Sequence, residues 1–281
     1  MITVEDRQAV VVAIQRALAE DIGPGDVTSE WVLDPERQAT GRFLVKEPGV
    51  IAGLEVVEEV FHQVDPTVRL RTLVVDGVPV VAGQVVAQVE GPAVSILSAE
   101  RVALNFLQRM SGIATQARRF VQAVHGTQAI ILDTRKTAPG LRVLDKMAVR
   151  LGGAHNHRLG LYDMVLIKDN HIAAAGSITA AVRRVRARNS AGLPVEVEVT
   201  SLDQLEEALA AGADRILLDN MDPPTMREAV RRVNRRVLLE ASGGITLENV
   251  AAVAATGVDY ISVGALTHSV RALDVSLDIV T

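Results

Sequence analysis

Residues 195–219 read VEVEVTSLDQLEEALAAGADRILLD, and this stretch decides the fold class. Valine alternates with glutamate over 195–199, which predicts a β-strand with one apolar face and one polar face. Apolar positions recur at helical spacing over 202–211, and 214–219 is again rich in branched apolar residues. A strand, a helix and a second strand in such close succession indicate a βαβ unit with two parallel strands.

The same alternation extends in both directions from this stretch and covers the C-terminal part of the chain. It predicts parallel strands joined by helices, in a sheet or a barrel. No G-x-G-x-x-G motif follows the first of these strands, which disfavours a dinucleotide-binding fold and favours an α/β barrel with fewer than eight strands. The predicted strands are 129–133, 163–168, 195–199, 214–219, 236–241 and 258–263, and the predicted helices are 141–151, 176–189, 202–211, 223–234 and 246–255.

The N-terminal part lacks this regular rhythm. We expect a helix over 2–20, a helix from 98 to 110 that ends at Ser111-Gly112, and a second helix over 115–124. Strands are expected around 42–46, 68–75 and 84–90. The ribbon-like segment 74–91 suggests a lipoyl or biotin carrier, but no lysine occurs between Lys46 and Lys136, so a carrier is excluded.

The amino-acid composition excludes several classes of protein. An apolar fraction of 48% in 281 residues supplies a sizeable core, yet no apolar run reaches the ~18–20 residues of a membrane span. A net charge of −5 and the presence of one Trp, two Tyr and four Phe argue against a nucleic-acid partner. The absence of cysteine excludes disulfides and thiolate metal sites, and leads us to expect a cytoplasmic protein.

Each predicted strand of the C-terminal part ends in a polar or charged residue. In α/β barrels the carboxyl ends of the strands open onto the active site, so we expect these side chains to face one mouth. Burying so many charges without a function would be costly. The residues are Asp133, Lys168, Glu198, Asp219, Glu240 with Ser242, and Ser262.

Positive charge is concentrated between residues 135 and 171, where seven Lys or Arg stand against three Asp. A cationic mouth implies a small anionic substrate that carries phosphates or carboxylates. Three of the cations, Arg142, Lys146 and Arg150, are expected on the solvated face of the 141–151 helix. The others are Arg135, Lys136, Arg158 and Lys168.

Two glycine-bearing turns and two carboxylates add to this mouth. The turns at 242–244 and 262–265 follow the last two strands, where barrels commonly bind phosphate through backbone N–H groups. Glu198 and Asp219 end neighbouring strands and offer the oxygen ligands that Mg²⁺ shares with substrate phosphates. Glu196 points to the same strand face as Glu198, and is expected to be a second polar layer or an ion-pair partner.

Two other chemistries stay open on the residues alone. The HNH sequence at 155–157 has the spacing of metal-dependent amidohydrolases, but it does not follow the first barrel strand. After His171 only His268 remains, so a two-metal site would lack ligands. Lys168 at a strand end could instead form a Schiff base, as in barrel aldolases.

Taken in order, the short motifs of the chain resemble those of the quinolinate phosphoribosyltransferase family. The resemblance covers nearly the whole chain, and a series of this length is highly specific. The motifs are ED (20–21), GDVT (25–28), ER (100–101), LN (104–105), SGIAT (111–115), DTRKT (133–137), HNHR (155–158), IKDNH (167–171), EVEV (196–199), LDN (218–220) and EASGGI (240–245).

The resemblance implies an N-terminal α/β sandwich domain over 1–113 and an incomplete α/β barrel of about seven strands over 114–266. The segment 267–281 is expected to return to the N-terminal domain. It also implies a homodimer or hexamer in which Arg101 reaches the neighbouring active site. The implied activity transfers phosphoribosyl from 5-phosphoribosyl 1-pyrophosphate to quinolinate with Mg²⁺, giving nicotinate mononucleotide, pyrophosphate and CO₂. A related transferase with another acceptor, such as nicotinate, is the nearest alternative.

The resemblance also implies a role for individual residues. The carboxylates of quinolinate are bound by Arg101, Arg135, His157, Arg158 and Lys168. Catalysis is carried by Lys136 and Lys168 near the pyrophosphate, and by Glu198 and Asp219, which handle Mg²⁺ and the ribose hydroxyls. The remaining substrate-binding residues, most of them at the 5-phosphate, are Thr134, Ser242, Gly243, Gly244, Ser262, Gly264 and Ala265.

Overall fold

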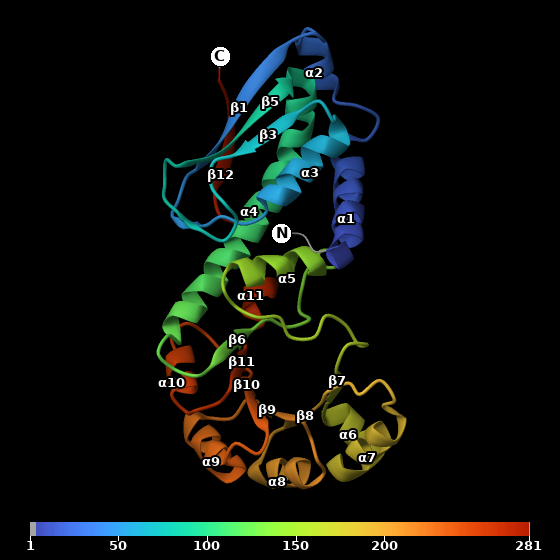
Figure 1. The fold of residues 1–281 in the computed structure, drawn as a ribbon, viewed down its shortest axis with the longest axis vertical. Helices are drawn as coiled ribbons and strands as arrows, with labels where there is room; N and C mark the ends of the chain where they lie inside the picture. Colours follow the sequence, from blue (N-terminus) through green and yellow to red (C-terminus); the bar gives the residue numbers. More distant parts are fainter. Residues whose placement is uncertain (1–3, 281) are drawn as a thin grey trace. The chain divides into compact units, whose positions relative to one another are not determined.

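The computed structural model describes residues 4–280, so residues 2 and 3 of the predicted first helix lie outside it. Its contacts divide the chain into two units, seen in Figure 1. The first unit runs to residue 118 and includes 137–153 and the segment from 269. The second comprises 119–136 and 154–268. The predicted domains assign 137–153 to the barrel instead. In the structure this segment is tied to the first unit, because the Arg109 guanidinium donates hydrogen bonds of 2.9 and 2.8 Å to the Asp145 carboxylate.

The first unit contains an antiparallel sheet with the strand order β12-β1-β5-β3. Its strands are β1 (Gln38–Val45), β3 (Arg69–Thr72), β5 (Val85–Pro92) and β12 (Val275–Val280), and a two-stranded sheet pairs β2 (Gly49–Val50) with β4 (Pro79–Val80). The helices are α1 (Val4–Ile22), α2 (Val27–Val32), α3 (Leu54–Val64), α4 (Ala93–Ala123) and α5 (Arg142–Leu151).

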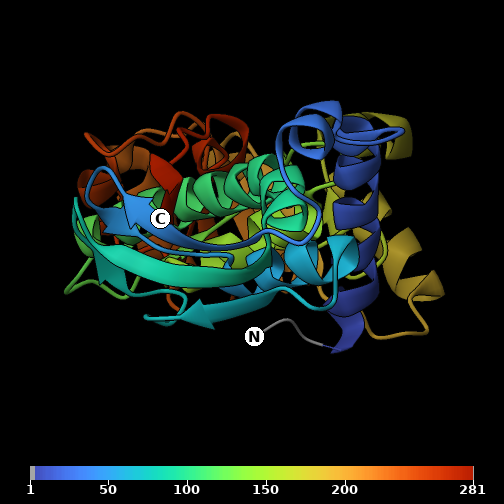
Figure 2. The same ribbon diagram turned by 90° about the horizontal axis from the view of Figure 1, so that it is seen from above.

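The antiparallel sheet of the first unit combines strands from both ends of this unit's sequence. Strand β12, from the C-terminal end of the chain, pairs along β1, and Phe43 of β1 packs edge-on against Phe61 of α3. Figure 2 shows α4 running beside the curved sheet. The Gln108 amide of α4 donates to the Val275 carbonyl of β12 over 2.7 Å, so the long helix and the C-terminal strand are joined directly.

Helix α4 is continuous, and the predicted end at Ser111-Gly112 is wrong. The Ser111 side chain is fully buried, and its hydroxyl exchanges hydrogen bonds with the backbone of Ala52 instead of capping a helix. Gly112 serves close packing: a Cβ there would lie 2.1 Å from the carbonyl oxygen of Arg271. Tertiary contacts within the first unit therefore place these residues in mid-helix, despite their local preference for helix ends.

The second unit confirms the predicted α/β fold with a parallel sheet of strand order β6-β11-β10-β9-β8-β7. The edge strands β6 and β7 do not pair with each other, so the sheet is open. It has six strands where about seven were expected, and a single parallel bridge joins Leu132 to His155 beyond β6. The strands are β6 (Ile130–Leu132), β7 (Val165–Ile167), β8 (Val195–Val199), β9 (Arg215–Asp219), β10 (Leu238–Ser242) and β11 (Tyr260–Ser262).

Helices alternate with these strands in the second unit (Figure 1). They are α6 (Asp169–Ala175), α7 (Ile178–Arg188), α8 (Leu202–Ala210), α9 (Pro223–Val233), α10 (Val250–Ala254) and α11 (Ala265–His268). Ser177, Ser201 and Asp222 begin three of them by accepting backbone N–H bonds, the usual role of such residues at helix starts. Helix α6 was not predicted, since 169–175 carries little apolar pattern. No helix within residues 4–280 has the length and apolar character needed to cross a membrane.

Strand β8 shows how this arrangement creates a functional face. Its valines 195, 197 and 199 are fully buried on one face of the sheet, where α7 and α8 contact the strand. The alternation of side chains along a strand then directs Glu196 and Glu198 to the opposite face. The sequence VEVEV therefore places two carboxylates on the face of the sheet opposite to α7 and α8.

Candidate active site

A pocket of about 830 Å³ opens at the carboxyl ends of the strands in the second unit. It brings together all of the predicted site residues except Arg101, which is exposed on the first-unit part of α4. The predicted residues that line the pocket are Thr134, Arg135, Lys136, His157, Arg158, Lys168, Glu198, Asp219, Ser242, Gly243, Gly244, Ser262, Gly264 and Ala265.

Every parallel strand except β6 directs its terminal polar side chain into this pocket. The parallel register aligns these ends: Ser242 lies beside Asp219, and Glu198 beside Leu217, one pleat below Asp219. Asp133 after β6 is the exception. Its side chain is fully buried and accepts hydrogen bonds from Asn156 and from the backbone N–H of His157.

Positive charge is concentrated on one wall of the pocket, at Arg135 and Arg158. Burial and the neighbouring charge of Arg135 both lower the pKa of Arg158, so these guanidinium groups are close enough to repel each other. One guanidinium nitrogen of Arg158 donates to the Met164 carbonyl over 3.1 Å. Two half-buried arginines that face the same space have the chemistry to bind carboxylate groups.

The backbone around Lys136 is held at two points. Its N–H donates to the Thr134 hydroxyl over 3.1 Å, and its carbonyl accepts from the Thr267 hydroxyl over 3.0 Å. Its side chain is exposed at the pocket. A fixed backbone that carries a flexible ammonium group is suited to follow a phosphate group during a reaction.

Two carboxylates face these cations from adjacent strands. The Lys168 ammonium donates to Glu198 over 2.5 Å, and the Asn220 amide donates to Asp219 over 2.9 Å. Both carboxylates border the pocket and are only partly buried. A pair of open oxygen donors beside a space for a phosphorylated ligand matches the preference of Mg²⁺ for few protein ligands. The residues therefore fit this ion.

The turn after β10 requires glycine. Gly243 has φ +94°, and a Cβ there would lie 2.2 Å from the side-chain oxygen of Asn220. Gly244 has φ +61° with nothing within 4 Å of the added carbon. Asn220 is itself left-handed at φ 53° and donates its backbone N–H to the Ser242 carbonyl over 2.8 Å. The two strand-end turns are thus packed backbone against backbone, as a phosphate-binding loop requires.

Beneath the cations lies a buried polar group that we call the carboxylate layer: Glu196, Glu240 and His157. The Nε2 atom of His157 lies 3.1 Å from Glu196 and 3.4 Å from Glu240, and both glutamates have no exposed surface. Glu240 also accepts from Arg215 over 3.2 Å and from the Ser262 hydroxyl. These are the residues of the described chain that could hold a buried metal ion, since their ligand atoms lie within 4.8 Å of one another.

Charge and burial set the protonation of this layer. Burial and the charge of Glu240 raise the pKa of Glu196 to about 7. Burial also acts to raise the pKa of Glu240, but hydrogen bonds from His157 and Ser262 more than offset it and lower this pKa. The predicted second polar layer around Glu196 is therefore present, with His157 as its partner.

Several pocket residues were missed as site residues by the sequence reasoning. Asn220 follows a predicted strand, so the strand-end rule could have identified it. Glu240 was expected at the mouth by that rule and lines the pocket, although no substrate role was predicted for it. Thr246 and His268 follow the glycine turns, and their proximity depends on how those turns fold back. The missed residues are Leu166, Leu217, Asn220, Ile245, Thr246 and His268.

The three cations of α5 do not belong to this pocket. Arg142, Lys146 and Arg150 lie in the first unit, and the prediction of a solvated face is wrong for Lys146, which is 2% exposed. All residues of α5 from Leu144 to Val149 are buried, so Lys146 has buried neighbours on both sides in the helix.

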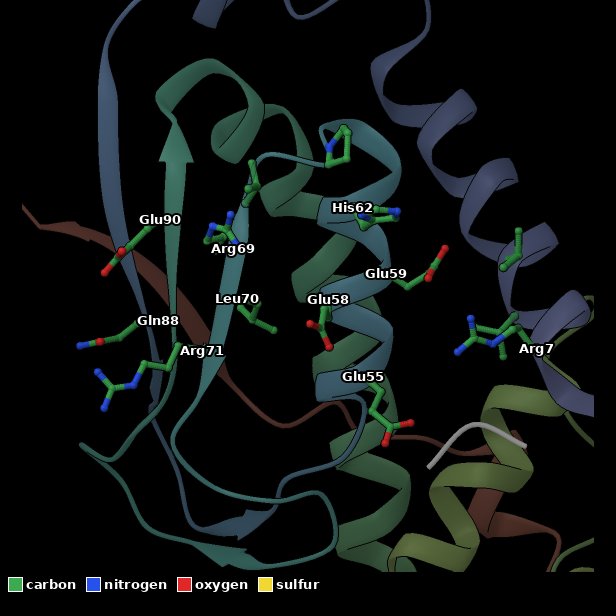
Figure 3. A pocket seen from close by; sticks show the side chains of 14 residues that line it. Arg7, Glu55, Glu58, Glu59, His62, Arg69, Leu70, Arg71, Gln88 and Glu90 are labelled. Atoms are coloured by element: carbon green, nitrogen blue, oxygen red, sulfur yellow. The ribbon is translucent and has the colours of Figure 1, made fainter. Parts of the chain in front are cut away.

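A second cavity of about 810 Å³ lies wholly in the first unit (Figure 3). We call it the charged groove. Glu55, Glu58 and Glu59 line it from α3, and Arg69 and Arg71 line it from β3. The acidic side chains of α3 thus face the basic side chains of β3 across the groove, and most of them are exposed.

Comparison with known proteins bears on both units. A family model described as the C-terminal domain of quinolinate phosphoribosyl transferase matches residues 113–278, and the N-terminal domain model matches residues 26–111. The nicotinate-nucleotide pyrophosphorylase [carboxylating] of Mycobacterium leprae is 51% identical over 95% of this chain and 95% of its own. Quinolinate phosphoribosyltransferase [decarboxylating] 2 of Nicotiana glauca, a mitochondrial protein, is 46% identical over 95% of this chain and 81% of its own. The structure of the nicotinate-nucleotide pyrophosphorylase from Francisella tularensis superposes with a TM-score of 0.93, at 40% identity, over 97% of this chain and 96% of that one.

Proposed function

The chain belongs to the quinolinate phosphoribosyl transferase family, and on this premise we propose that its second-unit pocket joins quinolinate to 5-phosphoribosyl 1-pyrophosphate. The products are nicotinate mononucleotide, pyrophosphate and CO₂, in the synthesis of NAD. The observation that carries this proposal is the convergence of four cations and two open carboxylates at one rim. A dianionic acceptor and a polyanionic donor require such fixed positive charge.

Quinolinate would lie against the arginine wall. Arg135 and Arg158 repel each other, and a carboxylate placed between them would relieve that repulsion. Lys168 can reach a second carboxylate, because its ammonium already faces the pocket beside Glu198. His157 was predicted as a further ligand, but both of its ring nitrogens are engaged within the protein, so its role in the proposal is in the pocket wall.

The phosphoribosyl donor would occupy the other side. Its 5-phosphate is assigned to the turns that contain Gly243, Gly244 and Gly264, where the backbone can approach closely. Its pyrophosphate is assigned to Lys136, whose ammonium can follow the leaving group. Glu198 and Asp219 would hold Mg²⁺ and the ribose hydroxyls; when bound, the ion supplies neutralising charge to the leaving pyrophosphate.

The charges that develop on the sugar and on the ring explain both the phosphoribosyl transfer and the decarboxylation. Loss of pyrophosphate leaves an oxocarbenium-like sugar, which the nearby carboxylates favour, and the quinolinate nitrogen bonds to it. The ribosylated ring is cationic, so the electron pair left when the adjacent carboxylate departs as CO₂ is stabilised by that ring. A proton from solvent completes the product.

The Schiff-base alternative is not favoured. The Lys168 ammonium donates to the Glu198 carboxylate, whereas a lysine that attacks a carbonyl must present a free amine. Borohydride treatment with a carbonyl substrate should therefore leave no adduct on Lys168. A transferase for nicotinate would need fewer cations than this pocket holds, since nicotinate has a single carboxylate.

The decisive assay measures Mg²⁺-dependent consumption of quinolinate with release of CO₂, with nicotinate as the matched control acceptor. We expect turnover with quinolinate only, and loss of turnover when the ion is removed with a chelator. Turnover of nicotinate at an equal rate would overturn the proposed acceptor.

The assembly is also part of the proposal. We propose a homodimer or hexamer in the cytoplasm, in which Arg101 of one chain completes the neighbouring pocket. Its exposed position on α4 supports this role. Mixing Arg101→Ala chains with Lys136→Ala chains should restore part of the activity that each variant lacks, because one pocket in such a mixed dimer keeps both residues. No restoration at any mixing ratio would count against a shared site.

A further inference from the structure

The carboxylate layer lies under the pocket and has no direct part in the proposed reaction. Glu196 and Glu240 are fully buried, and burying two carboxylates side by side opposes folding unless strong hydrogen bonds compensate. One oxygen of Glu196 has no hydrogen-bond partner among the described residues. A buried charge that is only half satisfied is unusual in a core, which points to a function for the layer.

The hydrogen bonds of His157 define the state of its ring. Nδ1 accepts the backbone N–H of Arg158 over 2.7 Å, while Nε2 faces Glu196 at 3.1 Å and Glu240 at 3.4 Å. Burial acts to lower the pKa of His157, but hydrogen bonds to Glu196 and Glu240 outweigh it and raise this pKa to about 9, so the ring holds its Nε2 proton firmly. With Nδ1 accepting from Arg158, the geometry assigns the ring proton to Nε2. Both carboxylates accept that one proton.

The backbone of residues 156–158 is also held by a buried carboxylate, that of Asp133. The backbone N–H of His157 donates to Asp133 over 2.8 Å, and the Asn156 amide donates to the second oxygen of Asp133 over 2.6 Å. The backbone before Arg158 is therefore held by Asp133, and the backbone N–H of Arg158 is held by the imidazole. Three buried carboxylates, on β8, on β10 and directly after β6, thus converge on one short segment.

We propose that Glu196 and Glu240 are positioning residues for Arg158, and that they act through His157. The carboxylates hold the imidazole in one tautomer and orientation, and the imidazole holds the Arg158 backbone. The Arg158 guanidinium then enters the pocket along a fixed path, with one nitrogen on the Met164 carbonyl. A preset guanidinium binds a carboxylate with less loss of freedom. This inference rests on the proposed binding of quinolinate by Arg158.

The two glutamates differ in how firmly they are held. Glu240 is anchored by Arg215 and Ser262, and the Arg215 guanidinium lies 4.2 Å from the centre of the Tyr260 ring. Glu196 has His157 as the hydrogen-bond partner of one oxygen, and its other oxygen is unsatisfied. We therefore expect Glu240 to be the rigid support, and Glu196 to be the member whose replacement changes the ring without disturbing the rest of the layer.

A double-mutant cycle tests the proposal. His157→Ala should raise the KM for quinolinate about tenfold, as expected for one lost charge-assisted contact, and leave the KM for the donor unchanged. In an Arg158→Ala background the same change should have less than a twofold effect, because the group that His157 positions is gone. Additive effects would show that His157 binds quinolinate by itself and would overturn the proposal. His157→Gln serves if the alanine variant does not fold.

Two further measurements separate positioning from mere stability. Glu196→Gln keeps an oxygen that can accept from Nε2 and should leave the KM for quinolinate nearly unchanged, whereas Glu196→Leu should raise it as His157→Ala does. Nitrogen NMR of the labelled enzyme should show His157 with an unprotonated Nδ1, lost in Glu196→Leu. A protonated Nδ1 in the wild-type enzyme would overturn the assigned tautomer, and does so even if quinolinate proves not to be the substrate.

Discussion

Two cavities within the described residues have nearly equal volumes, about 830 Å³ in the second unit and about 810 Å³ in the first, but they differ in how their charges are supported. In the charged groove, exposed acidic and basic side chains stand on neighbouring elements; Arg69, for example, lies opposite Glu90 in the strand register. In the pocket, the half-buried Arg158 is held through His157 by Glu196 and Glu240, which have no exposed surface. Volume therefore does not identify the site. Buried charge that folding alone does not require is the better indicator.

The largest expected difference between the two cavities is in catalysis. Lys136→Ala or Lys168→Ala should lower kcat/KM by about 100- to 1000-fold, because Lys136 stabilises the departing pyrophosphate and Lys168 holds a carboxylate of the acceptor beside it. Circular dichroism and thermal unfolding should show an intact fold. The matched control is Arg71→Ala in the charged groove, which removes a cation of the other cavity and should leave kcat/KM unchanged. Preserved turnover in both lysine variants would refute their roles.

Burial of charge also predicts a dependence of stability on pH. The pKa of Glu196 is raised to about 7, above its ordinary value. The folded state therefore favours the protonated carboxyl, and this contribution is present below about pH 4.5 and lost as the pH rises through about 7. Glu196→Gln cannot lose a proton.

The free energy of unfolding of the Glu196→Gln variant, minus that of the wild type, should therefore increase by about 1–3 kcal/mol between pH 5 and pH 8. Denaturant unfolding at several pH values measures this difference. A difference that stays constant with pH would mean that Glu196 is ionised throughout. No comparable effect is expected for Glu58→Gln in the charged groove, since that carboxylate is exposed.

The glycine turn offers a comparison within the pocket itself. Gly243→Ala and Gly244→Ala share the strain of a left-handed backbone, but only the Gly243 variant brings a carbon within 2.2 Å of Asn220. We expect a KM for the phosphoribosyl donor about tenfold higher in Gly243→Ala than in Gly244→Ala. Steady-state kinetics with each variant measures this ratio. Equal values would show that contact with Asn220 does not shape the phosphate site.

The smallest effects are expected in the charged groove. Arg69→Ala and Glu58→Gln replace exposed side chains and should change the free energy of unfolding by less than about 0.5 kcal/mol. Chemical denaturation of each variant measures this value. A larger loss would show that the groove supports the first unit, and would weaken the contrast between the two cavities.

The local sequence pattern predicted the structure correctly where no distant contact overrides local preference. The alternation in VEVEV predicted a strand with two inward carboxylates, and the polar residue at each strand end predicted a shared rim. It failed where distant contacts override local preference. Ser111 and Gly112 have the chemistry of a helix end, yet α4 continues through them because Ala52 and the Arg271 backbone pack there. Lys146 has the chemistry of a surface residue, yet it is buried in α5.

The amino-acid order alone determined that parallel strands alternate with helices and that polar groups follow those strands, because side-chain direction along a strand depends only on position. Only the tertiary structure decided which polar groups remain open to a ligand and which are consumed by internal hydrogen bonds. Asp133 and His157 belong to the same charged motifs as Lys136 and Arg158. Their partners come from segments far away in the chain, and the choice of a hydrogen-bond partner depends on which groups the fold brings within about 3 Å.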